Sequence, residues 1–180
     1  MKVISEHLNG LKLIKLDIFS DDRGFFTERF SKNKFDSIGV PSNYIQDNFS
    51  RSKAGVVRGL HFQRSPNQAK LVGCTRGKIL DVAVDIRKDS KTFGEHFSVE
   101  LTGENGLMLY VPAGFAHGFA ALEESDVMYK VDGLYNKEGE GGIIYNDAAI
   151  NINWGIKHPI VSDKDLKLGP WKEYLIYPVF

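Results

Sequence analysis

The chain has 180 residues, and its 23 Lys and Arg side chains balance 23 Asp and Glu side chains. Zero net charge argues against a nucleic-acid or anionic-membrane partner bound by bulk electrostatics, so any bound anion must be held by a local cluster of cations. The single cysteine, Cys74, excludes an intrachain disulfide framework and a cysteine-based zinc site.

The first ten residues carry Lys2, Glu6 and His7 and have no apolar stretch of the kind that forms a signal peptide. No later run reaches the roughly 18 apolar residues that a membrane span requires. The length fits one domain over residues 1–180, and we expect a soluble, cytoplasmic protein.

Predicted strands recur about every ten residues, with turn-forming residues between them, which is typical of an antiparallel sandwich or barrel. In the most regular candidate, side chains alternate between an apolar face and a face that carries Asp81. In a barrel the face of Asp81 points into the lumen, where an unpaired acid is costly. The predicted strands are residues 11–19, 25–30, 44–49, 56–62, 71–75, 79–87, 96–101, 107–111, 118–121, 127–131 and 143–145.

Helix is predicted in only two short segments. A turn capped by Ser31 buries Phe35 and stops at Gly39. Ser162 caps a second turn over residues 163–168.

The end of the chain, residues 171–180, is rich in aromatic and aliphatic side chains. A free tail does not normally carry so much apolar surface, so it must lie against this subunit or against a neighbour. We expect edge pairing of this tail into a dimer, because an open sandwich has sheet edges to protect.

One segment places three groups of distinct chemistry close together. It reads Val57-Arg58-Gly59-Leu60-His61-Phe62-Gln63, and Lys70 follows nine residues after the histidine. Arginine binds phosphate through two parallel hydrogen bonds, imidazole exchanges a proton near neutral pH, and lysine stabilises an oxyanion. Together they favour an enzyme that abstracts a proton next to a carbonyl. The alternative is that Arg58 and Lys70 are solvated and His61 is an ordinary strand histidine.

Two further segments offer groups that can contact a phosphorylated ligand. In Asp22-Arg23-Gly24-Phe25-Phe26-Thr27-Glu28, Arg23 can act as a second anion clamp and Phe26 as a stacking surface. Gln46-Asp47-Asn48 offers amide groups that can read the edges of a base or a sugar. An ordinary turn and a polar strand end are the alternative interpretations of these two segments.

His117 lies among small and aromatic residues, so it needs a hydrogen-bond partner or must stay neutral, and Asp81 is the candidate partner. A metal site in a β-barrel of this kind needs about three His or carboxylate ligands, commonly two of them spaced His-x-His. Here Gln63 stands two residues after His61, and His117 stands alone. We therefore expect no metal.

Taken together, these segments resemble the dTDP-4-dehydrorhamnose 3,5-epimerase family, which belongs to the cupin superfamily. The resemblance runs from Gly10 to Pro170 and implies a cupin-type double-stranded β-helix, or jelly-roll barrel, with short peripheral helices and no cofactor. Phe62 stands where many relatives carry tyrosine. The matching segments follow the family order and are Asp22-Arg23-Gly24-Phe25-Phe26, Gln46-Asp47-Asn48, Val57-Arg58-Gly59-Leu60-His61, Asp81-Val82-Ala83-Val84-Asp85-Ile86-Arg87, Thr92-Phe93-Gly94, residues 111–119 and Tyr129-Lys130.

The resemblance implies a role for each catalytic candidate. His61 removes the proton from carbon 3 or carbon 5 of a 4-keto sugar, and Asp165 accepts a hydrogen bond from this histidine. Lys70 donates to the keto oxygen as it becomes an enolate. Tyr129 returns a proton on the opposite face of the ring, which inverts the centre.

The resemblance also implies a substrate site, in which Arg23 and Arg58 hold the diphosphate and Tyr135 stacks on the thymine. It further implies a homodimer in which the N-terminal segment reaches across, so that Arg23 and Phe26 serve the neighbouring site. The other implied contacts to the nucleotide or the sugar are Glu28, Gln46, Asn48, Asp81, His117, Glu140 and Lys164.

The activity that follows is epimerisation at carbons 3 and 5 of dTDP-4-dehydro-6-deoxy-D-glucose, giving the L-sugar precursor of dTDP-rhamnose. An epimerase acting at carbon 3 alone, or a related ketoisomerase, stays open because Tyr129 does not settle the choice. A metal-dependent cupin oxygenase and a non-catalytic sugar-nucleotide-binding module are the alternatives from other classes.

Overall fold

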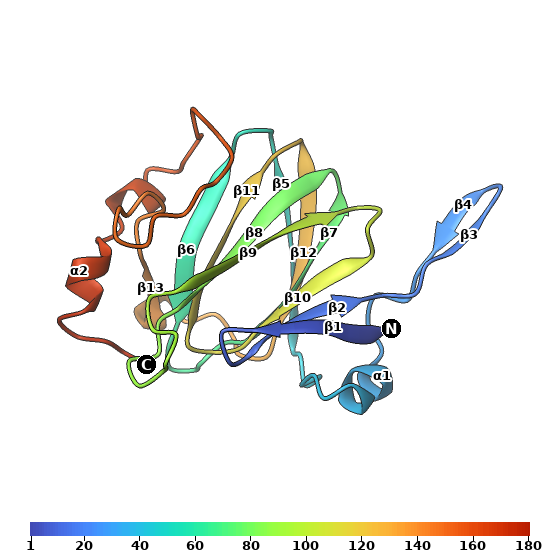
Figure 1. The fold of residues 1–180 in the computed structure, drawn as a ribbon, viewed down its shortest axis with the longest axis horizontal. Helices are drawn as coiled ribbons and strands as arrows, with labels where there is room; N and C mark the ends of the chain where they lie inside the picture. The colour runs from blue at the N-terminus through green and yellow to red at the C-terminus, as the bar shows by residue number, and fades with distance from the viewer.

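A computed structural model describes the whole chain, from Met1 to Phe180. Two antiparallel sheets face each other and a two-stranded hairpin projects from them, while the helices are short and peripheral (Figure 1). From β5 to β8 and from β9 to β13, each strand lies in the sheet opposite to that of the strand before it, which is the connectivity of a jelly roll. The prediction of an all-β jelly-roll barrel with short peripheral helices is confirmed.

The first sheet has the strand order β1-β2-β10-β7-β12-β5 and the second has the order β13-β6-β11-β8-β9. The strands of the first sheet span Lys2–His7 (β1), Leu11–Lys15 (β2), Leu107–Val111 (β10), Lys70–Arg76 (β7), Ser125–Val131 (β12) and Gln46–Ser52 (β5). Those of the second span Glu140–Gly142 (β13), Val57–Gln63 (β6), Phe115–Ala121 (β11), Lys78–Asp85 (β8) and His96–Thr102 (β9).

Both faces of β8 are covered, because a different cluster packs against each of them. Ala83 faces inward with Phe115 and Phe119 in the cluster between the sheets. Val82 and Val84 face outward and pack against the C-terminal part of the chain. The predicted alternation of this strand is therefore correct, with the polar face turned into the barrel.

The outer face of each sheet is covered by a different end of the chain. Helix α1, Lys32–Ser37, follows the N-terminal strands, and its Phe35 is fully buried over the first sheet. Ser31 precedes this helix as predicted, but its side chain makes no capping hydrogen bond. The second predicted turn is a single 3-10 turn, Asp165–Lys167, in which the amide of Asp165 donates to Oγ of Ser162 at 3.1 Å.

The C-terminal tail lies against its own subunit and does not pair as an edge strand. It forms helix α2, Trp171–Tyr174, and both of these aromatic side chains are buried on the outer face of the second sheet. The hydroxyl of Tyr174 donates to the carbonyl of Ile86 at 2.7 Å. The expected edge pairing is wrong because aromatic burial and this hydrogen bond hold the tail on the sheet face.

Two of the predicted strands fail in whole or in large part, and the observed strands β1 and β13 were not predicted. Residues 143–145 form no strand, since the last strand, β13, ends at Gly142. The segment 25–30 is extended only in β4, Gly24–Phe26, which pairs with β3, Phe19–Asp21. Strand β1 was not predicted, because it is a half-exposed edge strand without a continuous apolar face.

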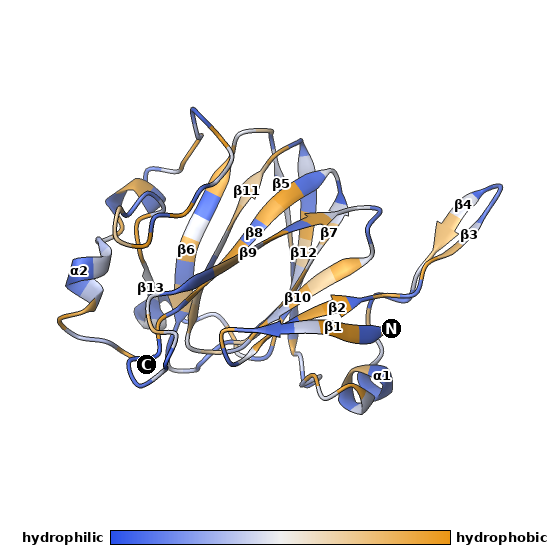
Figure 2. Cartoon of the chain, in the orientation of Figure 1, coloured by the Kyte–Doolittle hydropathy of each residue, from blue (hydrophilic) through white to orange (hydrophobic).

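The β3–β4 hairpin stands clear of the barrel (Figure 1). Its aromatic side chains Phe19, Phe25 and Phe26 are 63%, 51% and 68% exposed. Figure 2 shows hydrophobic residues on this arm where a surface loop is usually hydrophilic. Such an exposed apolar arm is typical of a segment that packs against another molecule.

Candidate active site

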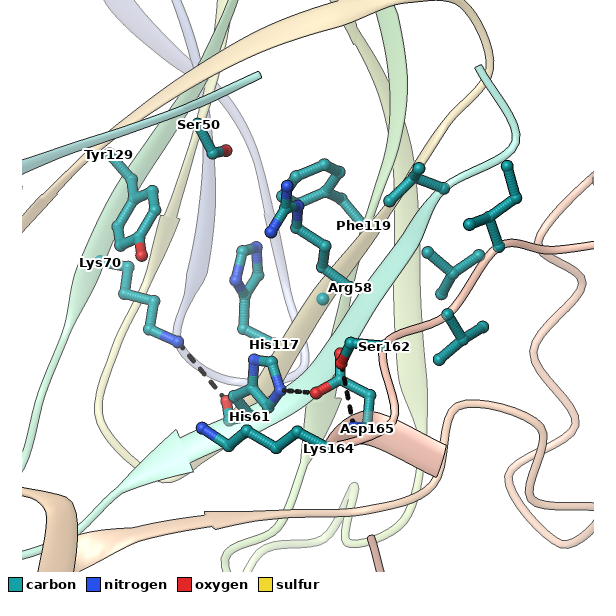
Figure 3. A pocket seen from close by; sticks show the side chains of 15 residues that line it. Ser50, Arg58, His61, Lys70, His117, Phe119, Tyr129, Ser162, Lys164 and Asp165 are labelled. Atoms are coloured by element: carbon teal, nitrogen blue, oxygen red, sulfur yellow. Dashed lines mark hydrogen bonds and ion pairs between the residues drawn. The ribbon is translucent and has the colours of Figure 1, made fainter. Parts of the chain in front are cut away.

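A cavity of about 520 Å³ lies between the two sheets (Figure 3). The first sheet contributes Lys70 and Tyr129, and the second contributes Arg58, His61 and His117. The segment that carries Asp165 closes one side. The remaining lining residues are Ser50, Val56, Val57, Gly118, Phe119, Ile160, Val161, Ser162 and Lys164.

Two glycines bring the histidines of the site together. His61 on β6 and His117 on β11 are direct partners in the antiparallel register. A Cβ atom on Gly59 would lie 2.6 Å from the Cα of Gly118, and Gly59 has a φ of +122°, so only glycine fits this close approach. The glycines of the Arg-Gly-Leu-His and Ala-His-Gly-Phe segments therefore set the spacing of the two strands at the site.

His61 and Asp165 form a hydrogen-bonded pair at the wall of the cavity (Figure 3). Nε2 of His61 lies 2.8 Å from Oδ1 of Asp165, and the other carboxylate oxygen accepts the amide hydrogen of Gly59 at 3.1 Å. Burial acts to raise the pKa of Asp165, but these hydrogen bonds outweigh it and hold the pKa below its ordinary value. An ionised Asp165 can accept a proton from Nε2, and in that tautomer of the neutral imidazole Nδ1 is the nitrogen that can accept a proton.

Lys70 projects from β7 into the cavity, and its Nζ donates to the carbonyl of His61 at 3.5 Å. Burial lowers the pKa of this ammonium to about 8, although the negative charges of Asp81 and Glu140 act to raise it. At neutral pH the ammonium is still mostly protonated, and it can donate a hydrogen bond to an oxyanion in the cavity.

Tyr129 reaches the cavity from β12, in the sheet opposite to that of His61. Burial raises the pKa of its hydroxyl, so the phenol stays protonated at neutral pH. A ligand between the sheets thus has a base on one side and a neutral proton donor on another.

The predicted pairing of His117 with Asp81 is present. Their contact is 2.8 Å from Nε2 to Oδ1, and Asp81 is completely buried. The second carboxylate oxygen of Asp81 is also buried and has no hydrogen-bond partner. The two residues lie on the neighbouring strands β11 and β8, and His117 lines the cavity.

Arg58 is oriented by hydrogen bonds from its own guanidinium to β5. Its Nε donates to Oγ of Ser52 at 3.0 Å, and its Nη2 donates to the carbonyl of Arg51 at 3.2 Å. Arg51 is itself fixed by Asp126 through contacts of 2.7 and 2.8 Å. This chain of contacts directs a permanent cation into the cavity.

Three predicted substrate residues form a cluster beside the cavity. Glu140 accepts from Lys164 at 2.6 Å and from the hydroxyl of Tyr135 at 3.0 Å. Burial acts to raise the pKa of Glu140, but these two donors outweigh it and hold the pKa below its ordinary value. Tyr135 is 57% exposed, so its ring is available as a stacking surface.

The structure does not bring every predicted site residue to the cavity of the same chain. Arg23 and Phe26 lie on the projecting hairpin, and the side chain of Arg23 is 89% exposed. Glu28 contacts Lys34 at 2.9 Å and does not line the cavity. Within a single chain, Arg23, Phe26 and Glu28 therefore lie away from the cavity that contains the other predicted site residues.

Gln46 and Asn48 lie on the face of β5 that also carries Ser50, and they hydrogen bond to each other at 2.8 Å. Asn48 is the direct register partner of Tyr129, so this face belongs to the inside of the barrel. The prediction missed Ser50, although it lies two residues after Asn48 and four after Gln46, so on a strand it shares their face.

No group of three or more His, Cys, Asp or Glu side chains is placed to hold a metal ion. No helix in the structure has the length and apolar character to cross a membrane.

The fold, the cavity and the histidine–carboxylate pair define a cupin-type barrel enzyme. The sequence model of dTDP-4-dehydrorhamnose 3,5-epimerases matches residues 5–173. The chain belongs to this family of isomerases.

Three known proteins illustrate the similarity. The dTDP-4-dehydrorhamnose 3,5-epimerase of Methanothermobacter thermautotrophicus is 43% identical over 180 residues, covering 98% of this chain and 97% of its own. The crystal structure of the Bacillus anthracis enzyme with TDP and PPi bound has a TM-score of 0.91 at 44% identity, covering 93% and 98% of the two chains. A 3'-monoepimerase from Streptomyces bikiniensis, in complex with dTDP-quinovose, has a TM-score of 0.88 at 30% identity, covering 95% and 88%.

Proposed function

We propose that the protein epimerises carbons 3 and 5 of dTDP-4-dehydro-6-deoxy-D-glucose to give dTDP-4-dehydro-L-rhamnose in dTDP-rhamnose biosynthesis. The observation that carries this proposal is the hydrogen-bonded His61–Asp165 pair at the wall of a cavity that also contains Lys70 and Tyr129. Family membership supports the same activity.

The reaction begins when Nδ1 of His61 takes the proton from the carbon next to the keto group. The electron pair moves into an enolate, and Lys70 donates a hydrogen bond to its oxygen as the negative charge develops. Tyr129 then donates its proton to the opposite face, which inverts that carbon. Proton exchange with solvent returns His61 to the neutral imidazole and Tyr129 to the phenol, and a second round inverts the other carbon. The keto group already makes these protons acidic, so this chemistry needs neither a redox cofactor nor a metal.

The remaining side chains hold the substrate. Arg58 binds the diphosphate, since its guanidinium is fixed and points into the cavity. Tyr135 stacks on the thymine, and the His117–Asp81 pair lines the sugar pocket. The further contacts to the nucleotide or sugar are Gln46, Asn48, Glu140 and Lys164, whereas Glu28, which contacts Lys34 outside the cavity, is not supported as a contact within the same chain.

A homodimer completes the site by exchange of the β3–β4 hairpin. In this arrangement Arg23 and Phe26 of one subunit reach the cavity of the other, where they add a second diphosphate clamp and an aromatic surface. The support is the exposure of Phe19, Phe25 and Phe26 on an arm that stands clear of its own barrel. Light scattering of the purified protein measures the subunit number, and a monomer at micromolar concentration contradicts this part of the proposal.

The test of the reaction is incubation with substrate in deuterated water. Mass spectrometry and NMR are expected to show exchange at both carbon 3 and carbon 5. His61→Ala is the matched control, and activity above about a tenth of wild type in that variant contradicts the role of His61 as the base.

The second candidate is epimerisation at carbon 3 alone. The similarity to the Streptomyces bikiniensis 3'-monoepimerase favours it as the alternative, because the fold by itself does not separate the two reactions. Exchange at one carbon in the deuterium experiment selects this second reaction. No exchange, together with nucleotide binding, identifies a binding module instead.

A further inference from the structure

The hydroxyl of Ser50 is a buried polar group without a partner at the edge of the active-site cavity. Ser50 lines the cavity from β5, and its Oγ makes no hydrogen bond in the structure. Leaving a hydroxyl both dehydrated and unpaired is destabilising, so such groups are normally satisfied by a ligand or by water. The position of this group inside a ligand-sized cavity points to a ligand.

Ser52, two residues further along the same strand, provides an internal comparison. Its Oγ accepts Nε of Arg58 at 3.0 Å, so it serves to orient the arginine. Side chains two positions apart on a strand share one face, so Ser50 and Ser52 point the same way. One serine is therefore used inside the protein, whereas the other has its hydroxyl free.

Figure 3 shows where the free hydroxyl lies in relation to the catalytic groups. Ser50, the guanidinium of Arg58 and the ring of Tyr129 lie toward one end of the cavity in this view, and His61 with Asp165 lies toward the other. In the proposed reaction the keto sugar lies near His61, so the diphosphate attached to carbon 1 extends toward Arg58. The hydroxyl of Tyr129 points away from Ser50, toward Lys70, whereas the hydroxyl of Ser50 lies on the side of Arg58, where the proposed reaction places the diphosphate.

We infer that Ser50 donates a hydrogen bond to the diphosphate of the bound nucleotide sugar and so acts beside Arg58 as a second, neutral phosphate-binding group. This inference rests on the proposed function and assigns Ser50 a positioning role. A fixed diphosphate sets how far the sugar ring reaches toward His61 and Tyr129. The neutral hydroxyl adds one hydrogen bond to the diphosphate. It adds no further positive charge to a cavity that already contains Lys70 and Arg58.

The experiment compares ligands with and without phosphate. We expect Ser50→Ala to weaken dTDP binding by about tenfold in calorimetry, which is the loss of one hydrogen bond to a charged group. Binding of thymidine, followed by ligand-observed NMR, is expected to change by less than about twofold, because thymidine has no phosphate. Ser50→Thr keeps the hydroxyl and is expected to restore most of the dTDP affinity. Ser50→Cys keeps the size of the side chain but donates weakly, so it should behave like the alanine variant.

A double-mutant cycle separates a direct contact from an effect through Arg58. In an Arg58→Ala background, Ser52→Ala is expected to have no further effect on dTDP binding, since its only partner is gone. Ser50→Ala is expected to weaken dTDP binding in that background as well. Unchanged dTDP affinity in Ser50→Ala and Ser50→Cys, or an equal loss for thymidine, overturns the inference.

The proposed function and the role of Ser50 are refuted by different results. A wild-type protein that neither binds dTDP nor exchanges deuterium into substrate refutes the proposed function. Wild-type binding and exchange with unaffected Ser50 variants refute only the role given to Ser50. Thermal melting of each variant confirms that an observed loss comes from a folded protein.

Discussion

Nε2 of His61 lies 2.8 Å from Oδ1 of Asp165, although 104 positions separate the two residues in the chain. The carboxylate has no freedom to turn away, because its other oxygen accepts the amide hydrogen of Gly59. Asp165 thereby fixes which nitrogen of the imidazole carries the proton. The nitrogen left unprotonated, Nδ1, is the one that can act as a base in the cavity.

The first prediction is that Asp165→Asn lowers kcat by about 100-fold or more while dTDP still binds. The amide of Gly59 requires an oxygen, so the asparagine places its NH2 group against His61. That NH2 can only donate, which forces the imidazole proton onto Nδ1 and removes the base. Steady-state kinetics and calorimetry check this, and a kcat within about threefold of wild type shows that the tautomer does not matter.

The second prediction concerns the proton donor. Tyr129→Phe removes the hydroxyl but keeps the ring that fills this part of the cavity. Abstraction by His61 is expected to continue, whereas reprotonation on the opposite face slows. In deuterated water, exchange into recovered substrate should then exceed product formation. Unchanged rate and product stereochemistry remove Tyr129 from the mechanism.

The third prediction is an alkaline limit on activity set by Lys70. Its pKa of about 8 means that the ammonium is mostly protonated at pH 7 and is lost as the pH rises through 8. We expect kcat/KM to fall with a slope of one proton above that pH. A profile that stays flat to pH 9.5 shows that the proton of Lys70 is not required.

The same lysine predicts how stability depends on pH. Its pKa is lowered from 10.5 in the folded protein, so between pH 8 and 10.5 the unfolded chain binds more protons than the folded chain. The contribution of Lys70 to the free energy of unfolding therefore rises with pH across this window. At pH 7, Lys70→Met is expected to melt at a higher temperature than wild type, with a difference that shrinks at pH 10. A difference that grows with pH contradicts the low pKa.

The sequence predicts those features that depend on a pattern of neighbouring residues, such as which face of a strand a side chain occupies. Alternation along β8 gave the inward position of Asp81, and its pairing with His117 follows because a buried acid needs a partner. Strand β1 was missed because an exposed edge strand lacks the apolar face on which such predictions rest.

Contacts between residues that are far apart in the sequence could not be predicted from local patterns. Nothing near His61 in sequence points to Asp165, and the family resemblance alone gave this pair. The position of Arg23 could not be predicted from one chain either, since it lies on an arm that makes few contacts with its own barrel. The tail was placed wrongly because burial of its aromatic side chains favours the sheet face over the sheet edge.

The last prediction tests whether the tail supports the catalytic strand from behind. Phe62 follows His61 on β6, and its ring packs edge-on against Tyr174 and Phe180 at centroid distances of 5.6 and 6.1 Å. Tyr174→Phe loses the hydrogen bond to Ile86 and should cost about 1 kcal/mol of stability. Tyr174→Ala also leaves a cavity and should cost about 3–5 kcal/mol, as for other buried aromatic residues.

The matched control is Tyr177→Ala, because this side chain is 82% exposed and should leave the melting temperature unchanged. Below its melting temperature, Tyr174→Ala is expected to lower kcat more than dTDP affinity, because Phe62 loses its support and His61 loses its fixed position against Asp165. Tyr174→Phe keeps the ring and should keep kcat. If both Tyr174 variants keep full kcat while their stabilities differ as expected, the tail stabilises the fold but does not position the base.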